Sequence, residues 1–140
     1  MSTKGKLVER LKRQSENTNK GKNILFRRLK KEHVFWSYDQ KSVTLAQMSD
    51  NFLIEKVLYH LDTDDVLKLF KVYSKEQVKD VWKNRLCPLG DYFDRMNYYY
   101  AVVFFGIKNP QRYIKIQSNR YIKNIINESE RIIASNGGHI

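Results

Sequence analysis

The sequence has little cysteine or proline and no long apolar run: it contains one cysteine, Cys87, two prolines and at most eight consecutive apolar residues, at 98–105. A single cysteine excludes an internal disulfide and a metal site built from several thiolates. Eight apolar residues are far fewer than the roughly 20 that a membrane-spanning helix needs. The three histidines show no metal-ligand spacing. We therefore expect a cytoplasmic protein without metal or membrane contact.

The motifs of common catalytic sites are missing as well. The sequence has no Walker A loop, no dinucleotide-binding glycine motif, no HExxH and no GxSxG. Residues 62–65, "DTDD", begin like a calcium loop but lack its later glycine and glutamate, and they suit the first turn of a helix. We predict no catalytic residue, no cofactor and no enzymatic activity. One alternative stays open, a site in which a carboxylate distant in sequence meets His60.

Positive charge is concentrated at the two ends of the chain. The net charge is +11, of which residues 1–32 contribute +8 and residues 107–140 contribute +4, while residues 33–106 are close to neutral. We predict three parts: a basic N-terminal arm (1–32), a helical core domain (33–106), and a C-terminal amphipathic helix with a tail (107–140). Basic ends suggest an anionic partner, either nucleic acid or an acidic protein surface. Alternatively, they serve solubility alone.

The N-terminal arm supplies the candidate nucleic-acid-binding residues, because Lys and Arg side chains contact phosphates without reading sequence. These candidates are Lys4, Lys6, Arg10, Lys12, Arg13, Lys20, Lys22, Arg27, Arg28, Lys30 and Lys31. Residues 12–23 are polar and show no apolar periodicity, so we expect a mobile segment there.

The middle of the chain shows helical apolar spacing behind residues that suit a helix N-cap. The pairs of cap and helix are Ser49 with 50–61, Thr63 with 64–73, Ser74 (in a capping box with Gln77) with 75–86, and Asp91 with 92–106. The last segment is apolar almost all round, which predicts a buried central helix. The expected fold is all-α: a compact bundle of about five short helices with a partly flexible basic arm and a C-terminal amphipathic helix.

Apolar side chains at two places are candidates for partner binding: Phe35, Trp36, Tyr121, Ile122, Ile125, Ile126, Ile132 and Ile133. Phe35 and Trp36 follow the basic arm and suit either a role in the core or a partner anchor, with nucleotide stacking as a third reading. The C-terminal stripe has helical spacing. Either it packs on the central helix or it lies in a groove of a partner.

Three stretches share their order and spacing with a known family: "FWSYD" (35–39), "DNFLIEKVLYHLDTDDVLKLFKVYSKEQVKDVW" (50–82) and "MNYYYAVVFFG" (96–106). In these stretches the chain resembles small bacterial helical proteins with an "FWD"-like motif, often encoded beside nucleotidyltransferase-like toxins of the abortive-infection type. Ser37 replaces the usual Asp after Phe-Trp, and Asp39 follows two places later. The first 32 residues and the C-terminal stripe lie outside the resemblance.

The resemblance implies a non-catalytic antitoxin that neutralises a nucleotidyltransferase-like toxin, and this is the function that we predict. The alternative is a nucleic-acid-binding protein, similar to a transcription regulator, whose basic arms contact DNA or RNA. The sequence leaves the oligomeric state open, a homodimer included.

Overall fold

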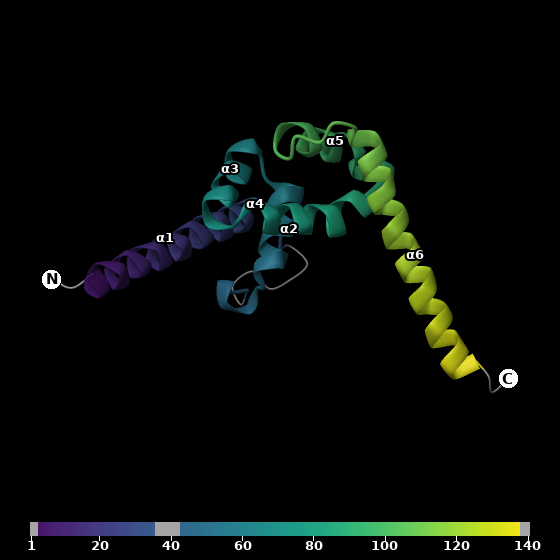
Figure 1. Cartoon of the computed structure of the whole chain (residues 1–140), viewed down its shortest axis with the longest axis horizontal. Helices are drawn as coiled ribbons and strands as arrows, with labels where there is room; N and C mark the ends of the chain where they lie inside the picture. Colours follow the sequence, from purple (N-terminus) through teal and green to yellow (C-terminus); the bar gives the residue numbers. More distant parts are fainter. Residues whose placement is uncertain (1–2, 36–42, 138–140) are drawn as a thin grey trace. The chain divides into compact units, whose positions relative to one another are not determined.

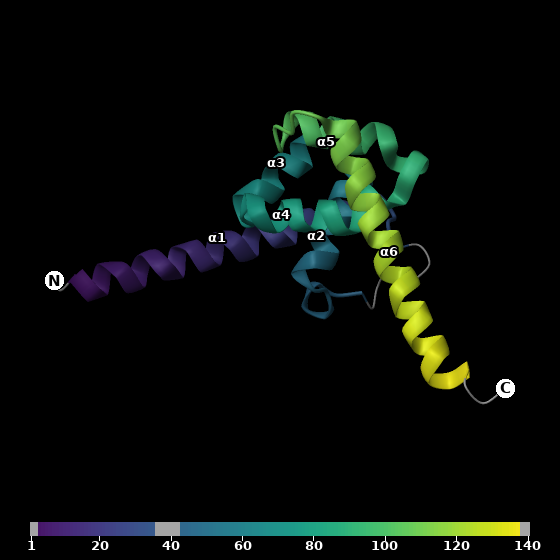
Figure 2. The same cartoon turned by 45° about the vertical axis from the view of Figure 1, so that its right-hand side comes forward.

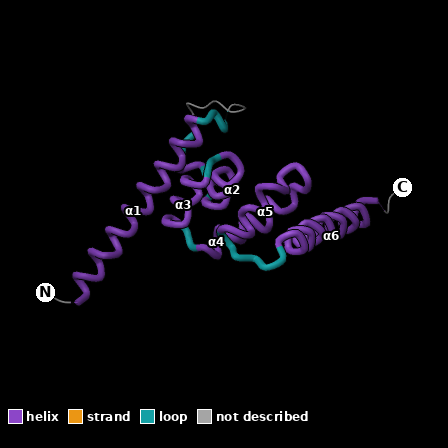
Figure 3. Tube along the Cα trace, turned by 90° about the horizontal axis from the view of Figure 1, so that it is seen from above, coloured by secondary structure: helices purple, strands orange, loops and turns teal. Residues whose placement is uncertain are grey.

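The computed structural model describes residues 3–35 and 43–137, and all regular structure in these ranges is helical (Figures 1 and 3). The elements are α1 (Thr3–Lys31), the 3-10 turn η1 (Leu45–Gln47), α2 (Asp50–His60), α3 (Thr63–Val72), α4 (Lys75–Val81), the π-helical turn η2 (Trp82–Leu86), the 3-10 stretch η3 (Cys87–Phe93), α5 (Asp94–Val103) and α6 (Pro110–Gly137). The prediction of an all-α fold is confirmed.

The chain divides into two compact units, Met1–Val78 (unit 1) and Lys79–Ile140 (unit 2). This division falls inside α4, whereas the sequence suggested boundaries after residues 32 and 106. The reason is that the second half of α1 belongs to the core of unit 1, and α6 packs against η2, η3 and α5 in unit 2.

The N-terminal segment is a continuous helix of 29 residues, so the prediction of a mobile stretch at 12–23 is wrong. The C-terminal end of this helix is fixed because Leu25 and Leu29 are fully buried. Adding residues to an existing helix is far easier than starting one, and half of residues 12–23 are good helix formers. Because the side chains of residues 12–23 are polar, apolar periodicity could not reveal this part of the helix.

Helix α1 crosses α3 at close range in unit 1. Gly21 lies so near Val72 that a Cβ atom on Gly21 would be 2.5 Å from the Val72 Cγ2 atom. Around this crossing, α2 and α3 supply the other buried apolar side chains, which include Leu53, Ile54, Val57, Leu58, Val66 and Leu69. A residue without a side chain at position 21 therefore lets the two backbones approach.

The helix starts of unit 1 follow local side-chain chemistry. The Ser49 hydroxyl accepts a hydrogen bond from the Phe52 N–H, and the Ser74 hydroxyl accepts one from the Gln77 N–H, as expected for N-caps. The expected cap at Thr63 is wrong, because the Asp62 carboxylate accepts the Asp65 N–H and α3 begins one residue earlier. A carboxylate also interacts favourably with the positive end of the helix dipole.

Unit 2 is built around Trp82, which is fully buried. Its ring stacks on Phe105 and on Tyr113, at centroid distances of 4.9 and 5.7 Å. The Trp82 indole N–H donates a hydrogen bond to the buried Asn97 side chain, and the Asn97 amide donates to the Leu86 carbonyl at 2.8 Å. Asn97 thus satisfies two polar groups that would be costly to bury alone.

The expected helices at 75–86 and 92–106 both differ in detail. The first ends at Val81 and continues as the π-helical turn η2. The second begins at Asp94, because Pro88 and Gly90 interrupt the helical course before it. Gly90 has a φ of 69°. The expectation that this second helix is buried all round is wrong: Tyr100 and Ala101 are buried, but Tyr98, Val102 and Val103 are 46–53% exposed.

We predict that Gly21→Ala lowers the free energy of unfolding by about 1–2 kcal/mol, because its Cβ atom overpacks the contact with Val72. In a Val72→Ala background the clash is gone, and the same change should stabilise the protein by up to about 1 kcal/mol through the helix propensity of alanine. Urea denaturation of the four proteins of this double-mutant cycle measures both values.

Gly5→Ala, at an exposed position of the same helix, controls for helix propensity alone. Equal effects of Gly21→Ala in both backgrounds would show that α1 and α3 do not approach at this point.

Candidate functional site

The residues of the C-terminal stripe share one exposed face of α6. We call Tyr121, Ile122, Ile125, Ile126, Ile132 and Ile133 the isoleucine face; each is 46–66% exposed. At 3.6 residues per turn they occupy an arc of roughly 140°. The expectation that this stripe packs on the central helix is wrong. Contact with the rest of unit 2 is made near the start of α6, where Ile114 is buried and Tyr113 stacks on Trp82.

The isoleucine face is uncovered because it lies on the part of α6 that extends past the rest of unit 2. Beyond its first turns, α6 extends away from η3 and α5, the elements of unit 2 against which it packs (Figures 1 and 2). Every residue from Asn119 to Asn136 is exposed. An amphipathic helix that extends past its own core is an available surface for another molecule.

Phe35 is 1% exposed, and its ring lies 6.0 Å from that of Phe26 between centroids. This burial favours its role in the core over that of a partner anchor or a nucleotide-stacking platform. Trp36 lies outside the described residues, and its role stays a prediction.

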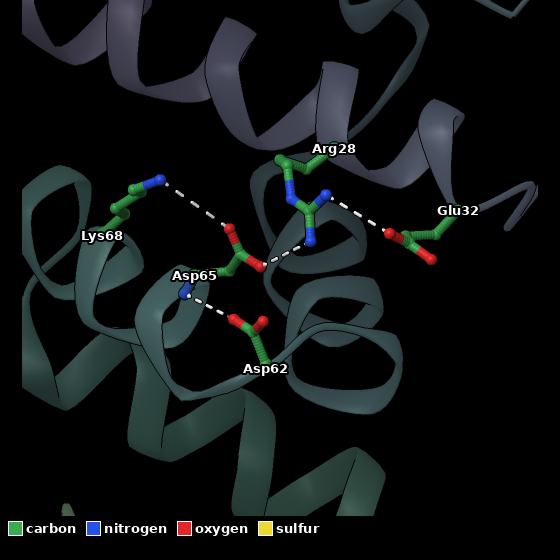
Figure 4. A network of polar contacts seen from close by, with 5 residues as sticks. All are labelled: Arg28, Glu32, Asp62, Asp65 and Lys68. Atoms are coloured by element: carbon green, nitrogen blue, oxygen red, sulfur yellow. Dashed lines mark hydrogen bonds and ion pairs between the residues drawn. The ribbon is translucent and has the colours of Figure 1, made fainter.

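Three of the predicted nucleic-acid-binding residues are engaged inside unit 1. The Arg28 guanidinium bridges Glu32 and the buried Asp65, with nitrogen–oxygen distances of 3.3 and 3.4 Å (Figure 4). The Lys30 ammonium lies over the Phe26 ring, and Lys22 pairs with Asp50 at 3.0 Å. Arg28 and Lys22 thereby join α1 to α3 and α2, whereas the Lys30 contact lies within α1. We assign the three side chains a structural role.

The other eight predicted basic residues are exposed: Lys4, Lys6, Arg10, Lys12, Arg13, Lys20, Arg27 and Lys31. Six of them, Lys6, Arg10, Arg13, Lys20, Arg27 and Lys31, follow one another at intervals of three, four or seven residues. Residues at these intervals share one face of a helix. We call these six the basic face of α1, and from Lys6 to Lys31 it is about 37 Å long at 1.5 Å per residue.

Sequence reasoning missed three residues of α6 that face the π-helical turn. Arg120, Gln117 and Asn124 line a surface groove together with Tyr121 and with residues 83–85 of η2. A signal was present: residues 107–127 contain no Asp or Glu. Spacing along the chain does not show that these two segments meet.

Metal-binding and nucleophilic groups can be placed for residues 3–35 and 43–137. No group of three or more His, Cys, Asp or Glu residues in these ranges is placed to hold a metal ion. Cys87 is fully buried, and burial raises the pKa of its thiol to about 12, so it stays protonated near neutral pH. His60 ends α2 with its ring against that of Tyr59. No described helix is long and apolar enough to cross a membrane.

Comparison of the chain with models of protein families, with curated proteins and with solved structures gives no match. The family resemblance of residues 35–39, 50–82 and 96–106 therefore stays a prediction.

Asp50 is the centre of a polar cluster in unit 1, and we expect this cluster to affect the stability of the protein at acid pH. The Tyr73 hydroxyl donates to the Asp50 carboxylate at 2.7 Å, and the Lys22 ammonium lies 3.0 Å from the same oxygen. The Tyr73 hydrogen bond, followed by the contact with Lys22, lowers the pKa of Asp50 below its ordinary value of 3.8. A lowered pKa stabilises the folded state above that value, and this contribution is lost as the pH falls through the folded-state pKa.

We predict that Asp50→Asn loses less stability than the parent protein between pH 5 and about pH 2.5, because the substituted residue has no charge to lose. The free energy of unfolding from urea titrations at each pH measures the difference. Glu16→Gln, an exposed position of α1, should keep the parental pH profile. If the free energy of unfolding of Asp50→Asn depended on pH as that of the parent does, this cluster would not contribute to the loss of stability in acid.

Proposed function

We propose that the protein is a non-catalytic protein-binding module and that the isoleucine face of α6 is the surface that its partner covers. The observation that supports this most is the exposure of six large apolar side chains on one helical face. Burial of apolar surface stabilises a complex by roughly 25 cal/mol per Å², so such a face favours association. Exposed apolar patches of this kind mark interaction sites in soluble proteins.

The geometry of the face suits a helix-in-groove complex. Ile125 and Ile126 lie three and four residues after Ile122, and Ile132 and Ile133 lie seven residues after these two. These are the intervals with which an amphipathic helix anchors in an apolar groove. From Tyr121 to Ile133 the face is about 18 Å long at 1.5 Å per residue. The basic residues Lys115, Arg120 and Lys123 are exposed on the same helix. A groove with an apolar floor and an acidic rim would complement both features.

The resemblance of residues 35–39, 50–82 and 96–106 supports a nucleotidyltransferase-like toxin as this partner. We therefore propose that the protein acts as its antitoxin. The neutralisation mechanism would be binding alone, with α6 occupying a groove that the toxin needs for activity.

We predict that Ile125→Asp/Ile126→Asp weakens the complex with the product of the adjacent gene roughly 100-fold, because it places two charges in an apolar contact. Co-expression followed by pull-down and titration measures binding, and relief of growth arrest measures neutralisation. The melting temperature of the isolated protein should stay unchanged, since both side chains are exposed.

Asn127→Asp/Ala134→Asp adds the same charge to the opposite side of α6 and should bind as the parent does. If the parent protein forms no complex, or if the Ile125→Asp/Ile126→Asp variant binds as tightly as this control, the proposed function is wrong.

A second candidate function is the binding of duplex DNA through the basic face of α1. The alignment of its six cations over about 37 Å favours it, because this length matches roughly one turn of duplex DNA. Such contacts would go to phosphates and would depend strongly on salt.

For this second function we predict that Arg13→Gln/Lys20→Gln lowers the slope of log affinity against log salt by about 1.8 for a 20-base-pair duplex. Lys4→Gln/Lys12→Gln removes the same number of charges at positions outside the basic face and should lower the slope less. Fluorescence anisotropy across a salt series provides both slopes. A parental slope near zero would exclude this function.

A further inference from the structure

The exposed part of α6, Asn119–Asn136, has an apolar repeat of seven residues. The isoleucine pair at 125–126 recurs at 132–133. A repeat of this length is typical of helices that wrap around each other over a shared apolar contact. Every residue of the segment is exposed, and the segment is about 27 Å long at 1.5 Å per residue.

Charge is distributed unevenly along the same helix. Residues 107–127 contain five Lys or Arg and no Asp or Glu, whereas the next four residues contain Glu128 and Glu130. Two copies of α6 that run in the same direction would place their basic parts side by side. Two copies that run in opposite directions place the basic part of each beside the carboxylates of the other, so charge complementarity favours an antiparallel pair.

One cation and one carboxylate flank the isoleucine face along the same edge. Lys123 and Glu130 are seven residues apart and exposed. Among the described residues of the chain, neither has an ion-pair partner, whereas Glu128 is paired with Arg131. In an antiparallel pair of helices equal edges meet, and in a parallel pair opposite edges meet. The antiparallel arrangement therefore brings Lys123 of each copy beside Glu130 of the other.

One antiparallel alignment satisfies the apolar and the charged contacts together. Within one residue, all facing pairs share a centre between positions 127 and 128, which is also the centre of the exposed part of α6. Each copy then covers the whole exposed part of the other, and the small Ser129 leaves room for Ile126. The facing pairs, one residue from each copy, are Ile122–Ile133, Ile125–Ile132, Ile126–Ser129 and Lys123–Glu130.

We propose that the free protein forms a symmetric dimer in which the α6 helices of two copies run antiparallel and cover each other's isoleucine face. The face matches itself in both shape and charge, which favours a second copy as its occupant. A toxin would bind by displacing this copy, and that consequence, unlike the dimer, rests on the function proposed above. The contact consists of one helix from each copy, which places it among the small interfaces of transient complexes, and we expect a dissociation constant on the order of 50 µM.

Sedimentation equilibrium of the purified full chain tests the dimer directly. Between about 1 µM and about 500 µM, the apparent mass should rise from 16.8 kDa towards twice this value. Ile125→Asp/Ile126→Asp should stay a monomer throughout. At about 1 µM the parent and this variant are both monomers and melt at the same temperature, whereas at about 500 µM the parent should melt at the higher temperature.

Charge reversal tests the alignment. Lys123→Glu replaces both ion pairs of the symmetric dimer with like-charge contacts and should weaken the dimer about 10-fold. Lys123→Glu/Glu130→Lys restores opposite charges and should return the dissociation constant to within about 3-fold of the parental value. The matched control is Arg120→Glu, the same change of charge at an exposed position on the opposite side of α6, and it should weaken the dimer less than about 3-fold.

Cross-linking tests the direction of the two helices. In a mixture of Lys123→Cys and Glu130→Cys proteins, a short bifunctional thiol reagent should join the chains faster than in either protein alone. Equal positions of an antiparallel pair would be displaced by roughly 10 Å along the helix axes. Cys87 does not compete, because it is fully buried and its thiol has a pKa of about 12.

A mass that stays at 16.8 kDa up to about 500 µM would overturn the dimer. Equal effects of Lys123→Glu and Arg120→Glu, or equal rates of cross-linking in the mixture and in the single proteins, would overturn the antiparallel alignment. These measurements use the chain alone, so their failure leaves the test with the product of the adjacent gene untouched. If that product bound without dissociating the dimer, the displacement would be wrong and the dimer would stand.

Discussion

Each long helix of this protein is held by one end, and the rest of the structure depends on that constraint. In unit 1 the buried side chains Leu25 and Leu29 fix the C-terminal part of α1. In unit 2 the first turns of α6 are fixed through Tyr113, which stacks on Trp82, and through the buried Ile114. A helix that is nucleated in a core extends at low cost, because each further residue adds a hydrogen bond without a new nucleation step. The uncovered halves then present their side chains to other molecules, and both proposed macromolecular surfaces lie on such halves or beside them.

The anchors themselves need polar contacts of good geometry in addition to apolar burial. In unit 1, Arg28 reaches the buried Asp65, while Gly21 lets α1 and α3 approach. Leaving a buried carboxylate such as Asp65 without its cation would cost far more than the pair contributes as a whole. In unit 2, Asn97 serves the Trp82 indole and a carbonyl of the π-helical turn. The same turn also places polar side chains, residues 83–85, at a surface groove that they line together with residues of α6.

Helix α6 carries two surfaces of different chemistry that meet at Tyr121. On one side, isoleucines form an apolar face that suits a protein groove. On the other, Arg120 and two amides line a polar surface groove together with η2. The partially apolar, partially polar character of tyrosine suits both environments.

The sequence by itself determined the helical class, two of the caps and the charged ends. Ser49 and Ser74 sit before apolar periods, and cap chemistry is local enough to read without a structure. Tertiary structure alone decided which apolar faces are covered and which cations are free to bind. Spacing shows that Ile125 lies on an apolar face, but it does not show whether another element reaches that face. It likewise cannot distinguish Arg28, which pairs with Asp65 37 positions later, from an exposed Arg27. Both outcomes depend on contacts between segments distant in sequence, and the periodicity of one helix carries no information about them.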